Sequence, residues 1–325
     1  MKRLYPDIGC SDDGYLETGD GHTLYYEVSG NPDGIPVLYL HGGPGAGLSP
    51  NYKRFFDANR YRIIGFEQRG CGRSKPFGNL ENNTTAHSLA DIQRLRRHLN
   101  IDQWVVFGGS WGATLALLAA IDQPETVQAL ILRGVFLGRQ QDRDWFLCPD
   151  GGGAQFFPEY YEQFVSRVPP PVTTEAICAH YQQEFAGNSD VSRLAALKRW
   201  YVWEERLSRV NLPPGTGDIT AHYPIPLMTS LAKLECHYLA NHCFIAENFI
   251  LDNLHRIAHI PGTIVHGRYD MICKSDAAYQ LHKSWECSDL LIVPEAGHST
   301  SEPGIAYALC RATRDMSRFI REQKK

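Results

Sequence analysis

Short apolar runs rich in β-branched and aromatic residues recur along this 325-residue chain, separated by segments with helical spacing. The runs are His22–Val28, Pro36–Leu40, Arg62–Phe66, Trp104–Phe107, Val127–Leu132, Thr263–Val265 and Leu290–Val293. Several of them are almost continuously apolar, as strands buried on both faces are. Because strands and helices alternate, the pattern predicts an α/β fold with a mostly parallel, doubly wound sheet and helices on both of its faces.

Two of the intervening segments show helical patterns. Ser88–Leu99 carries leucine and isoleucine at intervals of three and four residues. Ser88 and Asp91 match a capping box, so we expect a helix that begins there. Trp111–Ala120 is rich in alanine and leucine, which is typical of a helix packed on a sheet.

The alternation stops between about Gly138 and Ile257, and strand-like runs return only at Thr263. The stretch between them has tryptophan, tyrosine, glutamate and arginine at helical spacing. We therefore expect one large domain in which residues 1–137 and 258–325 form the sheet-bearing core. Residues 138–257 are expected to form an inserted helical cap, or lid, over the sheet.

Charge and cysteine usage exclude several classes of protein. The net charge is −4 without a basic patch, so we expect no nucleic-acid partner. Nine cysteines, an odd number with no C-x-x-C pair, argue against a disulfide framework or a zinc site and for reduced thiols in the cytoplasm. Because acidic residues and glycine follow the N-terminal residues where a signal peptide would be apolar, we expect no signal peptide. The sequence has no run of about 18 apolar residues, so we expect no membrane-spanning helix.

A strand, a tight turn and a helix meet where Gly108-Gly109-Ser110-Trp111-Gly112 has the form Gly-x-Ser-x-Gly. In such a nucleophile elbow the glycines avoid steric clash, and the turn lifts the serine hydroxyl out at the carboxyl end of the strand. The pentapeptide alone is a weak signal. Its context, an apolar strand before it and an alanine-rich helix after it, favours Ser110 as a nucleophile over a structural turn.

A serine nucleophile needs a base and a residue that orients the base. Asp270 follows one strand-like run, and His298 follows the next run, Leu290–Val293. Both residues therefore fall at the carboxyl ends of strands, where doubly wound sheets build their sites. We expect Asp270 to orient His298 and His298 to take the proton of Ser110. His266 is a rival base, although it lies within a strand run.

The loop His41-Gly42-Gly43-Pro44-Gly45 follows an early strand, where lipases and esterases place an oxyanion hole. Its small residues would let backbone N–H groups approach a tetrahedral oxyanion. We expect the N–H groups of Gly43 and Trp111 to donate to that oxyanion, and losing one such donor typically costs about 3–4 kcal/mol of transition-state stabilisation. An ordinary turn is the alternative interpretation of this loop.

Together these segments resemble the proline iminopeptidases (prolyl aminopeptidases) of the α/β-hydrolase superfamily, over about residues 4–319. The motifs that carry the resemblance are Asp20–Glu27, His41–Gly45, Gln68–Ser74, Gly108–Gly112 and Gly267–Asp270. The resemblance implies an α/β-hydrolase fold with an inserted helical lid. It also implies a cytoplasmic serine peptidase that removes N-terminal proline from small peptides, with no metal or organic cofactor.

The family binds the free α-amine of its substrate with glutamates from the lid. Trp200–Glu204 resembles its Trp-x-x-Trp-Glu segment, and Leu234–Tyr238 resembles its Ile-Glu-Asn-His-Tyr segment. The resemblance therefore implies that Glu204 and Glu235 bind the amine.

Helical spacing independently places both carboxylates in apolar stripes. Burying a carboxylate there without a partner costs several kcal/mol, so each needs a cation. A substrate ammonium is one candidate, and a structural arginine such as Arg199 or Arg206 is the other. Glu205 is off this face, and we expect it in solvent.

The small apolar pocket that a pyrrolidine ring needs is also suggested by the resemblance. Phe136, Trp145 and Cys273 lie where the family lines that pocket, with ordinary packing as the alternative. The chain departs from the family pattern at Glu67, Cys236 and Lys274 and in the longer, glycine-rich stretch 148–153.

The favoured function is a serine aminopeptidase that releases N-terminal proline through an acyl-enzyme. A carboxylesterase or amidase of the same fold with broader acyl specificity is the alternative, because it shares the triad and needs no buried carboxylates. A catalytically silent binding protein is a third hypothesis, although such chains usually lack a triad member. Epoxide hydrolases and dehalogenases need aspartate as nucleophile, so Ser110 disfavours them.

Overall fold

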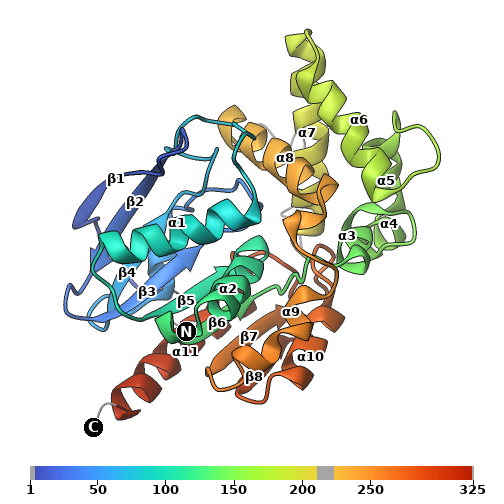
Figure 1. The fold of residues 1–325 in the computed structure, drawn as a ribbon. Coiled ribbons are helices and arrows are strands. Elements are labelled where there is room, and N and C mark those ends of the chain that lie inside the picture. The colour runs from blue at the N-terminus through green and yellow to red at the C-terminus, as the bar shows by residue number, and fades with distance from the viewer. Residues whose placement is uncertain (1–3, 211–222, 324–325) are drawn as a thin grey trace.

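An eight-stranded sheet organises the fold in the computed structural model, which describes residues 4–210 and 223–323 (Figure 1). The strands are β1 (Asp12–Glu17), β2 (Thr23–Gly30), β3 (Ile35–Leu40), β4 (Tyr61–Phe66), β5 (Trp104–Gly109), β6 (Val127–Arg133), β7 (Gly262–Gly267) and β8 (Ser288–Val293). Their order is β1-β2-β4-β3-β5-β6-β7-β8, with β2 antiparallel to both neighbours and every pair from β4 to β8 parallel. The predicted mostly parallel sheet is confirmed.

The edge strand β1 is the one that the sequence pattern did not predict. Four of its six residues are exposed and only Leu16 is buried. It pairs with β2 alone, at the end of the sheet. Because an antiparallel edge strand can face water, it needs no continuous apolar run.

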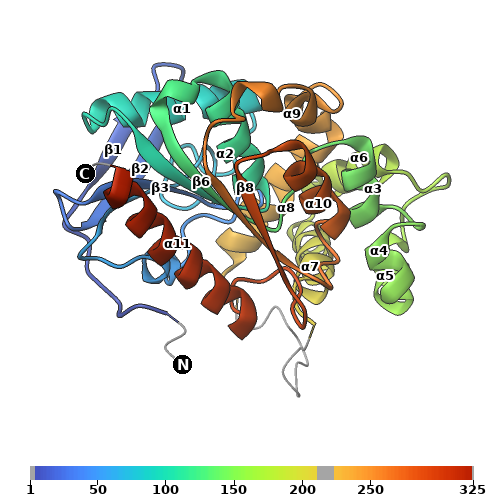
Figure 2. The ribbon, with the colours of Figure 1, turned by 90° about the horizontal axis from the view of Figure 1, so that it is seen from below.

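Helices cover both faces of the sheet, as expected. On one face α1 (Thr85–His98), α2 (Trp111–Asp122) and α10 (Ser275–Ser284) share a single apolar core with the sheet. On the opposite face lies α11 (Pro303–Gln323), which Figure 2 shows along the sheet. It packs with the short 3-10 helix η1 (Tyr52–Phe55).

The predicted start of the first helix is wrong. α1 begins at Thr85, and the side chain of Thr84 caps it by accepting the N–H of His87. Ser88 and Asp91 lie buried inside the helix, where Asp91 accepts two bonds from the Arg69 guanidinium, at 2.6 and 2.8 Å. The acidic residue therefore forms an ion pair with a distant loop and does not cap the helix.

Between β6 and β7 the described chain forms helices and no strand. They are α3 (Gln140–Leu147), α4 (Gly152–Phe156), α5 (Pro158–Val165), α6 (Thr174–Ala186), α7 (Asp190–Leu207), α8 (Ile225–Ala240) and α9 (Phe249–Asp252). Figure 1 shows α5, α6 and α7 standing away from the sheet, whereas α9 lies beside the core. Aromatic rings hold the outlying helices together: Phe164 stacks on Trp203 and on Tyr181, with ring centroids 5.2 and 5.1 Å apart. No helix in the described ranges has the length and apolar content to cross a bilayer.

Candidate active site

Ser110 occupies a strained turn between β5 and α2. Its backbone has φ 57° and ψ −125°, in a region that residues with a side chain rarely adopt. A Cβ at Gly108 would lie 2.0 Å from the carbonyl oxygen of Gly112, and a Cβ at Gly112 would lie 2.1 Å from that of Leu40. The turn can therefore form only with glycine at both positions, which is the geometry of a nucleophile elbow.

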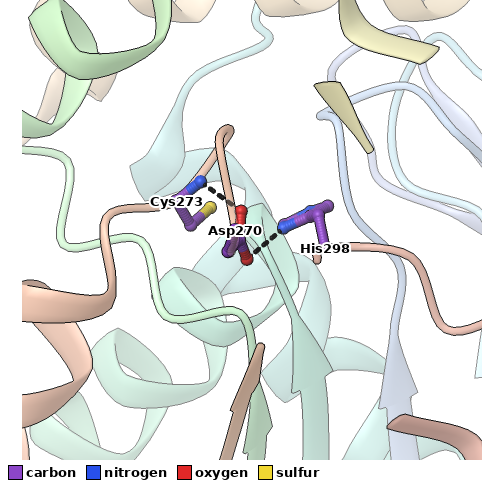
Figure 3. Close-up of side chains that lie close together, drawn as sticks. All are labelled: Asp270, Cys273 and His298. Atoms are coloured by element: carbon purple, nitrogen blue, oxygen red, sulfur yellow. Dashed lines mark hydrogen bonds and ion pairs between the residues drawn. The ribbon is translucent and has the colours of Figure 1, made fainter. Parts of the chain in front are cut away.

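Asp270 and His298 come together from the loops that follow β7 and β8 (Figure 3). The Nδ1–H of His298 donates to Oδ2 of Asp270 at 2.7 Å, while Oδ1 of Asp270 accepts the N–H groups of Ile272 and Cys273 at 3.0 and 2.7 Å. Burial lowers the pKa of His298, so its ring is neutral. Burial would raise the pKa of Asp270, but the adjacent His298 lowers it below its ordinary value. The carboxylate therefore fixes the tautomer that leaves Nε2 of His298 as an acceptor.

His266, the rival base, is buried within β7 with both ring nitrogens bonded to the backbone. Its Nδ1 accepts the N–H of Val135 at 3.1 Å, and its Nε2–H donates to the carbonyl of Cys273 at 2.9 Å. This imidazole joins the segment after β6 to the loop after β7. Neither of its nitrogens is free to accept the proton of Ser110.

Arg133, at the end of β6, is hydrogen-bonded to Nε2 of His298, the ring nitrogen that Asp270 leaves free. Its Nη1 donates to Nε2 of His298 at 2.7 Å and to the His298 carbonyl at 3.1 Å. The Ser110 hydroxyl makes its contact with the Cys273 thiol at 3.8 Å, and no hydrogen bond joins it to His298 within the described ranges. Sequence reasoning missed Arg133, although its place at the carboxyl end of the strand beside the elbow was a usable signal.

The glycine-rich loop after β3 packs directly on the elbow. A Cβ at Gly42 would lie 3.3 Å from Cβ of Ser110, and Gly43 has φ +103°, which favours glycine. Trp111 is the first residue of α2, so its N–H has no acceptor inside the helix. The structure thus places the loop and the helix start on either side of Ser110.

A cavity of about 410 Å³ lies between these core loops and the helices α7 and α8. Ser110, Arg133 and His298 line it from the core, and Tyr201, Glu204 and Leu231 line it from the helices. The nucleophile candidate and an acidic side chain of the inserted segment therefore face the same space.

Glu204, which is half-buried, and Glu235, which is buried, form an acidic pair. Glu235 accepts the indole N–H of Trp200 at 2.7 Å, whereas Oε2 of Glu204 is buried without a hydrogen-bond partner. Burial, together with the charge of Glu235, raises the pKa of Glu204 well above its ordinary value. Burial also raises the pKa of Glu235, to about 8.

Neither arginine that was considered as a structural partner pairs with these two carboxylates. Arg199 pairs with Glu184, and the Arg206 guanidinium lies 4.6 Å from the centroid of the Tyr160 ring. The expectation that Glu205 is solvated is wrong: its side chain is 15% exposed and pairs with Arg209 at 2.8 Å.

The three residues expected to line a proline pocket are Phe136, Trp145 and Cys273, and the structure places them outside the lining of this cavity. Cys273 is buried beside the Ser110 hydroxyl, but none of the three lines the 410 Å³ space. The Phe136 carbonyl accepts the Thr114 hydroxyl at 2.6 Å. The Trp145 ring packs so closely on Gly152 that a Cβ there would lie 2.1 Å from it. The glycine-rich stretch 148–153 thus makes room for Trp145.

Asp270, Cys273 and His298 are also the one group in the described ranges whose side chains could jointly ligate a metal, with ligand atoms within 4.8 Å of one another. Both carboxylate oxygens of Asp270 are already engaged, one by the imidazole and one by two backbone N–H groups. The hydrogen bonds that Asp270 accepts from the His298 ring and from the Cys273 N–H bring these three side chains together.

Comparisons with known proteins agree with this fold and show the family of the chain. The family described as "alpha/beta hydrolase fold" matches residues 35–304. A "Probable proline iminopeptidase" of Leptolyngbya boryana is 43% identical over 99% of this chain and 98% of the relative. A "Proline iminopeptidase" of Xanthomonas citri is 44% identical over 96% and 99%. One from Arabidopsis thaliana is 41% identical over 98% and 83%.

Solved structures agree at the level of the fold. The esterase of Exiguobacterium antarcticum has a TM-score of 0.63 at 20% identity, over 94% of this chain and 98% of that one. The proline iminopeptidase of Mycobacterium smegmatis has a TM-score of 0.57 at 17% identity, over 94% of this chain and 99% of that one. At such identities the likeness concerns the fold alone.

Proposed function

The chain belongs to the proline iminopeptidases of the α/β-hydrolase fold family, and from this premise we propose that Ser110, His298 and Asp270 are its catalytic triad. The protein is a hydrolase, a prolyl aminopeptidase acting on peptides. The observation that carries the assignment is the shared cavity: it contains Ser110, His298 and Glu204, whose buried oxygen has no partner.

The first step of acyl transfer needs a base for the Ser110 proton, and the neutral imidazole of His298 can act as that base. His298 donates Nδ1–H to Asp270, so its Nε2 lone pair can accept the Ser110 proton as the oxygen attacks the prolyl carbonyl. His298 then returns that proton to the leaving amine, and water releases proline from the acyl-enzyme by the same steps. The attack requires Ser110 Oγ to turn from Cys273 toward Nε2 and Arg133 to leave Nε2.

Negative charge on the tetrahedral oxygen would be met by backbone donors. We assign this role to the N–H groups of Gly43 and Trp111: Gly43 follows Gly42, which packs on Ser110, and Trp111 follows Ser110 at the start of α2. Donors of this kind act strongly because they are held in place before the charge develops.

The acidic pair supplies the preference for a free amine. A prolyl ammonium entering the cavity would meet the unpartnered oxygen of Glu204, with Glu235 behind it held by Trp200. Without a substrate, the raised pKa values mean that the pair retains a proton near neutral pH. Amine binding would displace that proton and satisfy charges that are costly to bury alone.

Four further assignments belong to the same proposal. Residues 138–257 act as a cap that contributes the acidic pair to a site on the core.

Phe136, Trp145 and Cys273 contact the pyrrolidine ring once the substrate has opened space beside Ser110. The substrates are small peptides with a free N-terminal proline. The enzyme acts in the cytoplasm, where its nine free cysteines would stay reduced.

A panel of aminoacyl arylamides at fixed pH tests this function, with Ser110→Ala as control. We expect the prolyl substrate to be preferred, acetylation of its amine to abolish turnover, and Ser110→Ala to remove the activity. Equal turnover of free and acetylated substrates would instead indicate a broader esterase or amidase. Activity that survived in Ser110→Ala would contradict the triad.

A further inference from the structure

Gln68 forms three hydrogen bonds that join two separate parts of the site. It follows β4 and is 4% exposed. Its backbone N–H donates to Nε2 of His41 at 3.0 Å, and its side-chain Nε2 donates to the His41 carbonyl at 2.9 Å. Its Oε1 accepts the indole N–H of Trp111 at 3.0 Å. One amide group therefore connects the loop after β3 to the start of α2.

Those two parts carry the proposed oxyanion donors. His41 precedes the glycines of the loop by one and two residues, and the Gly43 N–H is the first donor. The second donor is the backbone N–H of Trp111 itself. Gln68 is thus hydrogen-bonded to His41, two residues before the first donor, and to the side chain of Trp111, whose backbone N–H is the second donor. Gln68 itself does not line the cavity.

The orientation of the Gln68 amide is fixed from both ends. A rotated amide would direct N–H groups at the Trp111 indole N–H and an oxygen at the His41 carbonyl, so both bonds would be lost. Burial lowers the pKa of His41, which keeps Nε2 an acceptor, and its Nδ1–H donates to the Gly42 carbonyl at 3.0 Å. The Trp111 ring is held edge-on to Tyr238, with centroids 4.9 Å apart.

We propose that Gln68 is the positioning residue of the oxyanion hole: it holds the N–H groups of Gly43 and Trp111 at the spacing that the tetrahedral oxyanion requires. This rests on the proposed function, because it presupposes those two donors. Oxyanion donors are effective only within about 2.7–3.1 Å of the developing charge. A small shift of the loop after β3 or of the start of α2 would therefore weaken the hydrogen bonds to the oxyanion. The substrate in its ground state places no comparable demand on them, so Gln68 acts on turnover and not on substrate binding.

The test is Gln68→Met, which keeps the bulk of the side chain and removes its amide. We expect kcat on a prolyl arylamide to fall about 10- to 100-fold with KM nearly unchanged. Two inhibitors separate the roles. Pyrrolidine-2-boronic acid becomes tetrahedral at boron on bonding to a serine oxygen, whereas proline, the reaction product, keeps a planar carboxylate. Boronate affinity should fall in proportion to kcat, and proline affinity should stay the same.

The matched control is Gln93→Met, which removes another buried glutamine amide, on α1 and outside the cavity. It should leave kcat and both affinities unchanged. If Gln68→Met does not fold, Trp111→Phe removes the indole N–H that donates to Gln68 while keeping an aromatic ring beside Tyr238, and it should lower kcat about 3- to 10-fold, again with KM unchanged.

The proposal is overturned if the folded Gln68 or Trp111 variant keeps full kcat, if boronate and proline affinities fall equally, or if Gln93→Met loses kcat to the same extent. Failure of the triad itself gives a different result, since Ser110→Ala would then retain activity and the boronate would not compete with substrate.

Discussion

Nη1 of Arg133 donates to Nε2 of His298 at 2.7 Å, on the opposite side of the ring from Asp270, whose carboxylate accepts Nδ1–H at the same distance. The imidazole is therefore held between a cation and an anion. The atom that the proposed mechanism needs as base is the one that the arginine occupies. Arg133 also lines the cavity, and its Nε is buried without a partner, so an arriving substrate could displace the guanidinium.

Arg133→Met should move the acidic limb of the pH profile. After burial and Asp270, the Arg133 charge is the next influence on the pKa of His298, and it lowers that pKa. Removing the charge raises the pKa, so the neutral base is lost at a higher pH than in the parent enzyme. The measurement is kcat/KM against pH on an acyl ester without an amine. Arg206→Met, on the cap, is the control, and an acidic limb that stayed in place would contradict the proposed contact.

Asp270→Asn should lower kcat by about 10⁴-fold with little change in KM. Asparagine is nearly isosteric, but it can present an N–H to the ring and so favour the wrong tautomer of His298. Thermal unfolding should show that the variant is folded, and a serine-directed fluorophosphonate should label it slowly. Turnover within a factor of about ten of the parent would argue against Asp270 as the orienting acid.

The acidic pair predicts a dependence on pH that only amine substrates share. Because the pKa of Glu235 is raised to about 8 and that of Glu204 is raised too, the pair loses its proton as pH rises toward 8. The kcat/KM for a prolyl arylamide should therefore increase from pH 6 to 8, and an amine-free ester should lack this rise. Glu235→Gln should remove the rise and reduce kcat/KM for the arylamide selectively. An equal loss on both substrates would exclude an anchoring role.

The same pair should cost stability at alkaline pH. A raised pKa means that the folded state holds a proton that the unfolded state releases, so stability falls as pH rises from the ordinary glutamate value toward 8. Glu235→Gln keeps an acceptor for Trp200 and removes the charge. It should raise the free energy of unfolding at pH 8 by about 1–3 kcal/mol and make little difference at pH 5. Denaturant unfolding at both values, with Glu162→Gln on the exposed face of α5 as control, checks this; a gain that did not depend on pH would contradict it.

The sequence by itself determined the strands β2 to β8, the elbow at Ser110 and the loops of Asp270 and His298. Each depends on local order: an apolar run predicts a buried strand, and a parallel sheet brings the ends of such strands together. The apolar stripes that contain Glu204 and Glu235 were equally visible, because helical spacing alone places them.

Tertiary structure decided which polar groups meet. Asp91 became the partner of Arg69 and not a cap, and Glu205 paired with Arg209 instead of facing water. The contacts of Arg133 with His298 and of Gln68 with Trp111 join residues 165 and 43 positions apart. No local pattern encodes such pairs, because the free energy that selects them comes from burying polar groups together, and that depends on the packing of the whole chain.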